Sequence, residues 1–274
     1  MISYPDINPE IFRIGPIAIR WYGLMYAVGF ATSYVLVKYQ IKKKSKIPSR
    51  MKKRSKGDGE QFNEMLLDSL YSYLILGLVI GARLGYVLFY DFTTYIHNPL
   101  EIFAVWHGGM SFHGGLIGCL LAGYIFCWRY KADFWRTADL VIVTAPVGLG
   151  LGRLGNFING ELFGRVTTVP WGMIFPSGGP FPRHPSQLYE FMLEGVFLFG
   201  VLWLIKDRTQ ASGALSAVFL LLYGLLRFFV EFFREPDPQL GFIISFFTMG
   251  QVLSILTAGA GIILLLVRRR IHKV

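Results

Sequence analysis

Seven long apolar stretches dominate this sequence and limit what it can fold into. About 20 consecutive apolar residues form a helix that crosses the hydrocarbon core of a bilayer. The fourth stretch is short, contains Pro146 and is rich in glycine, which predicts a broken or tilted helix. We therefore predict an all-α polytopic membrane protein with about seven transmembrane helices, near Ile17–Val37, Leu66–Tyr90, Met110–Trp128, Leu140–Gly155, Leu188–Ile205, Ala214–Phe233 and Ile243–Val267.

The composition excludes the main soluble classes. Hydrophobic residues make up 53% of the 274 residues and charged residues only 16%, whereas an average globular domain carries about 25% charge. This argues against a soluble enzyme, a disordered protein and a disulfide-stapled secreted domain. Cys119 and Cys127 lie in one apolar stretch, about 12 Å apart along a helix, so they are too far apart to form a disulfide. Without a Cys/His cluster we expect no metal site.

The basic residues predict the orientation. Ten of them follow the first stretch between Lys38 and Lys56, and others follow the third, fifth and seventh stretches. Positive charge marks the cytoplasmic ends of membrane helices. The N-terminus is therefore expected outside and the C-terminus in the cytoplasm, as an odd number of spans requires. Topology also accounts for the net charge of +10, so we expect no nucleic-acid partner. The ten-charge block follows the first stretch, the reverse of a cleaved signal peptide.

The basic residues at the other ends are all arginine, which binds phosphate or carboxylate through two parallel hydrogen bonds. Arg13 and Arg20 fit a role at the membrane interface. Arg83, Arg153 and Arg227 lie in apolar sequence, where a charge is expensive and usually functional. These three arginines predict an anion site near the outer face.

Three polar clusters occur where lipid-facing sequence is expected. His113 lies in a glycine-rich segment, Gly108–Gly115, and its imidazole can act as a general base. A second segment, Gly148–Arg165, carries Arg153, Asn156 and Glu161 but lacks the Lys-Ser/Thr of a phosphate-binding loop. In the sixth stretch Tyr223, Arg227 and Glu231 are spaced by four residues, so they share one helix face. A purely structural role, as a hydrogen-bonding His113 or a buried Arg227–Glu231 pair, is the alternative for each cluster.

Together these segments resemble the bacterial prolipoprotein diacylglyceryl transferase family. The resemblance covers nearly the whole chain in the family's order, and its most specific part is Gly152–Glu161. The Lys38–Lys56 loop is unusually basic, and His107 occupies a position that we expect to vary. The matching segments are Trp21–Leu24, Gly108–Gly115, Gly152–Glu161, His184–Glu190 and Glu231–Pro236.

The resemblance implies transfer of the diacylglyceryl group from phosphatidylglycerol to the lipobox cysteine of a prolipoprotein, with release of glycerol 1-phosphate. It implies a single integral-membrane domain over residues 1–274 in the bacterial inner membrane, with its site open toward the periplasm. The basic loop at 38–64 is then cytoplasmic and a segment at about 156–186 is periplasmic. The expected partners are phosphatidylglycerol, the lipobox peptide and the surrounding bilayer, and no cofactor is expected.

For this reaction we assign His113 as the base and Arg153 and Arg227 as the phosphate clamp. Tyr22, Asn156 and Tyr223 can donate hydrogen bonds to the lipid headgroup, and Glu161 and Glu231 can orient arginines or act as the base. Gly164 and His184 complete the expected substrate-binding set. A transporter with an anion path is the rival class, but it predicts inverted repeats, and the sequence shows no internal repeat. A structural membrane scaffold explains the polar clusters least well.

Overall fold

The structure is a computed structural model, and it describes residues 2–5, 7–15, 17–45, 64–104, 108–209, 211–236, 242–244 and 247–271. The chain forms two compact units. The first contains residues 1–36 and 139–274, and the second contains residues 37–138. Most of the basic loop expected at 38–64, as well as His107, lies outside the described residues.

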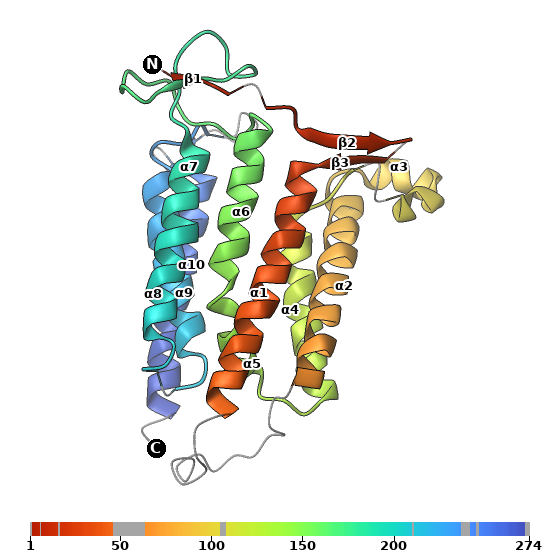
Figure 1. The fold of residues 1–274 in the computed structure, drawn as a ribbon, viewed down its shortest axis with the longest axis vertical. Helices are drawn as coiled ribbons and strands as arrows, with labels where there is room; N and C mark the ends of the chain where they lie inside the picture. The colour runs from red at the N-terminus through yellow and green to blue at the C-terminus, as the bar shows by residue number, and fades with distance from the viewer. Residues whose placement is uncertain are drawn as a thin grey trace. The chain divides into compact units, whose positions relative to one another are not determined.

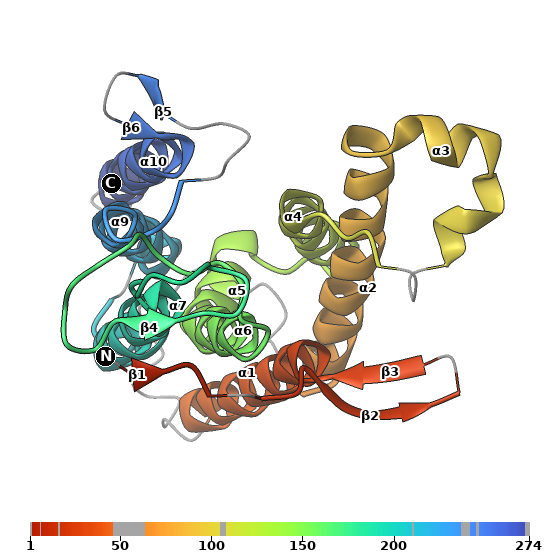
Figure 2. The same cartoon turned by 90° about the horizontal axis from the view of Figure 1, so that it is seen from above.

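The first unit is mainly helical (Figure 1). Its helices are α1 (Trp21–Ser45), which runs on into the second unit, α5 (Phe134–Ile142), α6 (Ala145–Ile158), α7 (Ser186–Glu190), η4 (Phe191–Phe197), α8 (Leu198–Ile205), α9 (Ala214–Val230) and α10 (Met249–Ile271). The α5 helix begins in the second unit. In the view from above, α9 and α10 lie side by side (Figure 2).

In the part of the chain that the structure describes, three pairs of short strands accompany these helices. The strand β1 (Ile2–Ser3) pairs in parallel with β4 (Met173–Ile174). The strands β2 (Glu10–Ile14) and β3 (Ile17–Arg20) form an antiparallel hairpin, as do β5 (Phe242–Ile244) and β6 (Phe247–Thr248). The expected spans Ile17–Val37 and Ile243–Val267 therefore begin as strands, and their helices begin only at Trp21 and Met249. An apolar run of this kind does not distinguish a strand from the start of a helix.

Several helices have the length and composition of membrane spans. Within the described residues three qualify singly, at Met65–Phe89, Ser186–Ile205 and Met249–Ile271, and the pair α5 and α6 qualifies together. The prediction of a helical membrane protein is therefore confirmed. Of the other expected spans, α1 and α4 (Phe112–Arg129) are helical, and α9 is a shorter apolar helix of 17 residues.

The fourth expected span is broken, as the sequence predicted. Its two halves, α5 and α6, meet at an angle of 44°. The break follows from Pro146, which lies in the first turn of α6 and has no N–H with which to continue the preceding helix. At the break, the Thr144 hydroxyl lies 2.6 Å from the Ser33 hydroxyl of α1.

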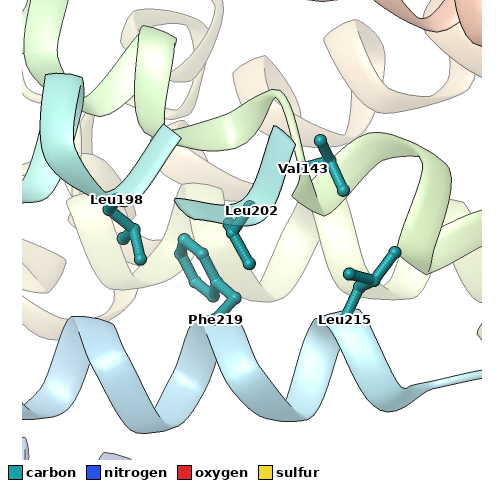
Figure 3. Packing of buried hydrophobic residues seen from close by; sticks show 5 residues of the cluster. All are labelled: Val143, Leu198, Leu202, Leu215 and Phe219. Atoms are coloured by element: carbon teal, nitrogen blue, oxygen red, sulfur yellow. The ribbon is translucent and has the colours of Figure 1, made fainter. Parts of the chain in front are cut away.

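A buried apolar cluster lies at this break. Figure 3 shows its five residues, which are Val143 at the junction of α5 and α6, Leu198 and Leu202 of α8, and Leu215 and Phe219 of α9. Between membrane helices, side chains of this kind hold the helices together by van der Waals packing. The cluster therefore packs α5, α6, α8 and α9 together.

The second unit contains α2 (Glu64–Phe89), α3 (Phe92–His97), the 3₁₀ helix η2 (Pro99–Phe103) and α4. Its two long helices pack through glycine. A Cβ atom added at Gly81 of α2 would lie 2.7 Å from the Cα atom of Gly118 in α4. Small residues allow membrane helices to approach this closely. Gly77, Gly81 and Gly85, which are spaced by four residues, therefore form a close-packing face of α2 against α4.

Candidate active site

Buried charges of the first unit form one connected group, which we call the ion-pair cluster. Its members come from α6, α7, η4 and α9 and from the segment that follows α9, and they join through nitrogen–oxygen distances of at most 3.9 Å. The six members are Arg153, Glu190, Glu194, Arg227, Glu231 and Arg234. Expected site residues Arg153, Arg227 and Glu231 are thus brought together.

Glu190 is the centre of the cluster. Its side chain is 1% exposed, and one carboxylate oxygen lies 2.9 Å from Nη1 of Arg227 and 3.1 Å from Nη1 of Arg234. Its other oxygen is paired with Nε of Arg153. One carboxylate therefore holds three guanidinium groups from three separate segments.

Glu231 holds Arg227 from a second direction. Its carboxylate lies 2.9 Å from Nη2 of Arg227, one helical turn earlier, and accepts a hydrogen bond of 2.9 Å from the Thr248 hydroxyl. The ion pair that the four-residue spacing suggested is therefore present and buried. A guanidinium fixed on two sides has few orientations, as a preorganised phosphate site requires.

The contacts of Glu194 with arginine are longer than those of Glu190 and Glu231. Glu194 is 0% exposed, but its nearest arginine nitrogens lie 3.8 Å away on Arg227 and 3.9 Å away on Arg153. Among the described residues neither of its oxygens has a hydrogen-bond partner. The Tyr223 side chain is close enough to interact electrostatically with Glu194 and Arg227, which adds Tyr223 to the expected residues that gather here.

The local backbone explains how the two glutamates reach these arginines. The η4 segment is π-helical, a form that widens the turn and occurs often at functional sites. Glycines allow this segment to lie directly against α6, since a Cβ atom at Gly150 would be 3.0 Å from the Cα atom of Gly195. Arg153 follows Gly150 by one turn, and Glu194 precedes Gly195. Arg153 therefore lies opposite Glu190 and Glu194.

Asn156 and Glu161 form a second polar pair at the end of α6. The Asn156 amide donates a 2.9 Å hydrogen bond to the Glu161 carboxylate, and Asn159 donates another of 3.1 Å. Glu161 thus orients amides, in contrast to our suggestion that it could orient an arginine. Tyr22 packs against Gly155 and is close enough to Arg153 and Glu161 to interact with both electrostatically.

Gly164 and His184 lie in the segment between α6 and α7. The Gly164 N–H donates to the His184 carbonyl at 2.8 Å, and Gly164 also forms a bridge with Arg234. Burial holds the pKa of His184 below its ordinary value, so its ring is neutral near pH 7. Nδ1 of His184 lies 3.0 Å from the Tyr189 hydroxyl, which accepts a hydrogen bond from Trp171. These residues anchor the backbone around Arg234.

His113 belongs to the second unit, where it is exposed in the first turn of α4. Ser111 caps this helix by accepting a hydrogen bond of 3.2 Å from the Gly114 N–H, and its own N–H donates to the Ala82 carbonyl. The cap fixes where α4 begins and therefore the position of the His113 side chain in its first turn.

The contacts of Arg83 are structural, and they differ from those expected of an anion site. Arg83 is 3% exposed, and among the described residues its hydrogen bonds all go to backbone carbonyls, at distances of 2.5–3.3 Å. Its guanidinium also lies 5.0 Å from the ring centroid of Tyr95. The acceptors are the carbonyls of Glu101, Ile102, Ala104, Gly108 and Gly109, so Arg83 ties η2 to the segment that leads to His113.

The sequence is also similar to those of known proteins. Residues 9–267 match the family described as prolipoprotein diacylglyceryl transferase. The chain belongs to this family. A phosphatidylglycerol–prolipoprotein diacylglyceryl transferase of Desulfotalea psychrophila is 52% identical over 260 residues, which cover 92% of this chain and 90% of the relative. Proteins of the same name from Coxiella burnetii and Nitratidesulfovibrio vulgaris are 52% and 47% identical over 93% and 98% of this chain, and over 93% and 97% of their own lengths.

Three residues of the ion-pair cluster, Glu190, Glu194 and Arg234, were not among the expected site residues. Glu190 and Glu194 are spaced by four residues at the start of an apolar stretch, the same signal that drew attention to Arg227 and Glu231. Arg234 continues the face of α9 beyond the end of the helix. The four-residue spacing that identified Arg227 and Glu231 therefore also identifies Glu190 and Glu194 as candidate site residues.

The Arg83 contacts predict that Arg83→Gln destabilises the second unit. The variant loses charge-assisted hydrogen bonds and leaves buried or partly buried carbonyls without donors, so we expect a loss of about 3 kcal/mol or more. Thermal unfolding in detergent measures it. Arg129→Gln, at an exposed position in the last turn of α4, should change stability by no more than about 0.5 kcal/mol. Equal melting of the two variants would contradict the assigned role.

Proposed function

We propose that this protein transfers the diacylglyceryl group of phosphatidylglycerol to the lipobox cysteine of prolipoproteins, the first step of lipoprotein maturation. The thiolate sulfur attacks the glyceryl carbon, a C–S bond forms, and the C–O bond to phosphate breaks with its electron pair on oxygen. Glycerol 1-phosphate leaves. Family membership over residues 9–267, together with the arginines fixed in the ion-pair cluster, supports this reaction.

The direct test uses purified protein, phosphatidylglycerol and a synthetic lipobox peptide. We expect one released glycerol phosphate for each peptide that gains a thioether-linked diacylglyceryl group. A peptide with serine in place of the cysteine should remain unmodified. If peptide and lipid stay unchanged in the presence of folded protein, the proposed function is wrong.

Arg153 and Arg227 are the proposed phosphate clamp. Negative charge grows on the leaving phosphate oxygen as the C–O bond breaks, and guanidinium groups held in place stabilise it without reorganising. Asn156, Tyr22 and Tyr223 are proposed donors to the lipid headgroup, while Gly164, His184, Glu161 and Glu231 support the site. His113 is the proposed base for the thiol.

Arg153→Ala and Arg227→Ala should each slow transfer by at least about 10²–10³-fold, the usual effect of losing one oxyanion donor. Initial rates at equal amounts of membrane-inserted protein measure this effect. Arg13→Ala is the control, because Arg13 is an exposed residue paired with Glu10, and its rate should match that of the wild type. A clamp variant as fast as Arg13→Ala would refute the clamp.

His113→Gln should slow transfer by about 10²–10⁴-fold near neutral pH, the effect of losing a general base. A free cysteine thiol ionises near pH 8.5, so the deficit should shrink as the pH approaches that value. His97→Gln is a control in the same unit, where the exposed His97 ring contacts only the Thr93 carbonyl among the described hydrogen bonds. A deficit that is constant with pH would show that His113 is not the base.

We also propose seven spans in the bacterial inner membrane, with the N-terminus and the site toward the periplasm. The distribution of basic residues supports this orientation, and β1 and the last turn of α10 lie at opposite ends of the first unit (Figure 1). The basic loop at 38–64 is then cytoplasmic and residues 156–186 are periplasmic within a single integral-membrane domain.

Cysteine labelling tests the orientation. In a background without Cys119 and Cys127, Ser177→Cys should react with an impermeant reagent in intact spheroplasts. Ser45→Cys should react only after the membrane is opened, because the basic loop is expected in the cytoplasm. Labelling of Ser45→Cys in intact spheroplasts would reverse the proposed topology.

A further inference from the structure

The ion-pair cluster contains as many negative as positive charges. Three guanidinium groups, of Arg153, Arg227 and Arg234, face three carboxylates, of Glu190, Glu194 and Glu231. With every member ionised, the net charge of these six residues is zero. Without substrate, the positive charge of the arginines is therefore compensated by the carboxylates.

The proposed lipid substrate changes this balance. A phosphodiester carries one negative charge, so its entry would leave the ionised cluster with an excess charge of −1. An excess charge in a low-dielectric environment is costly, and buried groups usually avoid it by changing their protonation. Binding of the phosphodiester is therefore expected to be coupled to the loss of one negative charge among the carboxylates.

The contacts of the three carboxylates differ. Glu190 is paired with three arginines, at 2.9 Å and 3.1 Å from Arg227 and Arg234, with Arg153 in contact with its other oxygen. Glu231 lies 2.9 Å from Arg227 and accepts a hydrogen bond from Thr248. Glu194 is 3.8 Å or more from its arginines, and neither oxygen accepts a hydrogen bond from a described residue. Its charged form is the least stabilised of the three.

We propose that Glu194 takes up one proton from water when the phosphodiester binds, so that the occupied site stays neutral while Glu190 and Glu231 keep the arginines in place. The charged and titratable groups that face Glu194 come from three neighbouring elements and the segment after α9. They are Arg153 of α6, Glu190 of α7, Tyr223 and Arg227 of α9, and Arg234. The proposal rests on the proposed function, because phosphatidylglycerol supplies the phosphodiester.

Calorimetry tests the proton directly. Short-chain phosphatidylglycerol is titrated into the detergent-solubilised protein near pH 7, in buffers with different ionisation enthalpies. The dependence of the binding enthalpy on the buffer gives the number of protons taken up, which we expect to be about one. Glu194→Gln should take up none. Glu235→Gln, a partly exposed partner of Arg183 outside the cluster, should still take up one.

The pH dependence of affinity provides a second measurement. Uptake of one proton weakens wild-type binding by up to about tenfold per pH unit on the alkaline side. Glu194→Gln mimics the neutral acid, so its affinity should not vary with pH and should exceed that of the wild type at alkaline pH. Glu190→Gln makes the same change of charge one turn away, but it releases three guanidinium groups and should weaken binding at least about tenfold at every pH.

These outcomes separate the inference from the proposed function. A wild-type protein that lipidates the peptide but takes up no proton overturns the role of Glu194 and leaves the transferase assignment standing. Proton uptake that persists in a folded Glu194→Gln variant overturns it as well, as does tighter binding by Glu190→Gln than by Glu194→Gln. A wild-type protein that binds the lipid with proton uptake but never modifies the peptide supports the inference and overturns the proposed function.

Discussion

The carboxylate of Glu190 is the contact on which the first unit depends. It holds arginines from α6, from α9 and from the segment after α9. In an apolar environment such pairs are not screened, and the loss of one partner leaves the other as an uncompensated buried charge. Glu190 therefore fixes the relative positions of three segments through the same atoms that position the arginines of the proposed phosphate clamp.

The second unit satisfies its buried arginine by a different means. Arg83 donates to backbone carbonyls of η2 and of the glycine segment, and no described carboxylate pairs with it. Two of those carbonyls belong to Gly108 and Gly109, whose φ angles of 86° and 74° are rarely adopted by residues with a side chain. Arg83 thus stabilises the backbone that leads to His113 and has no free donors for an external anion.

The sequence predicted the helices well and their ends less well. Apolar length identified the regions of α2, α8 and α10, and Pro146 identified the break between α5 and α6. The hairpins before α1 and α10 were missed because Ile17–Arg20 and Phe242–Ile244 are as apolar as the helices that follow them. Each of these strands pairs with the neighbouring strand of its own hairpin, and hydropathy does not reveal this pairing.

Whether a site contact could be predicted depended on how far apart its residues lie in the chain. The Arg227–Glu231 pair lies within one helical turn, so spacing alone predicted it. Glu190 binds arginines that are 37, 37 and 44 positions away, and nothing in local spacing reports such contacts. For the same reason Arg83, Arg153 and Arg227 looked equivalent in the sequence, although the structure gives Arg83 carbonyl partners and the other two carboxylate partners.

The carboxylates that fix the arginines also set a limit on how tightly the proposed clamp can hold phosphate. Arginines without them would attract an anion more strongly, but they would be uncompensated in the empty site and free to adopt many orientations. With them, the arginines are held in place and the charge of the empty site is balanced. In the proposed reaction the phosphodiester becomes a phosphomonoester, whose second ionisation lies near pH 6. The product therefore carries more negative charge than the substrate, and the buried glutamates oppose this added charge. A site built in this way stabilises charge as it develops on the leaving oxygen and still favours release of the glycerol phosphate.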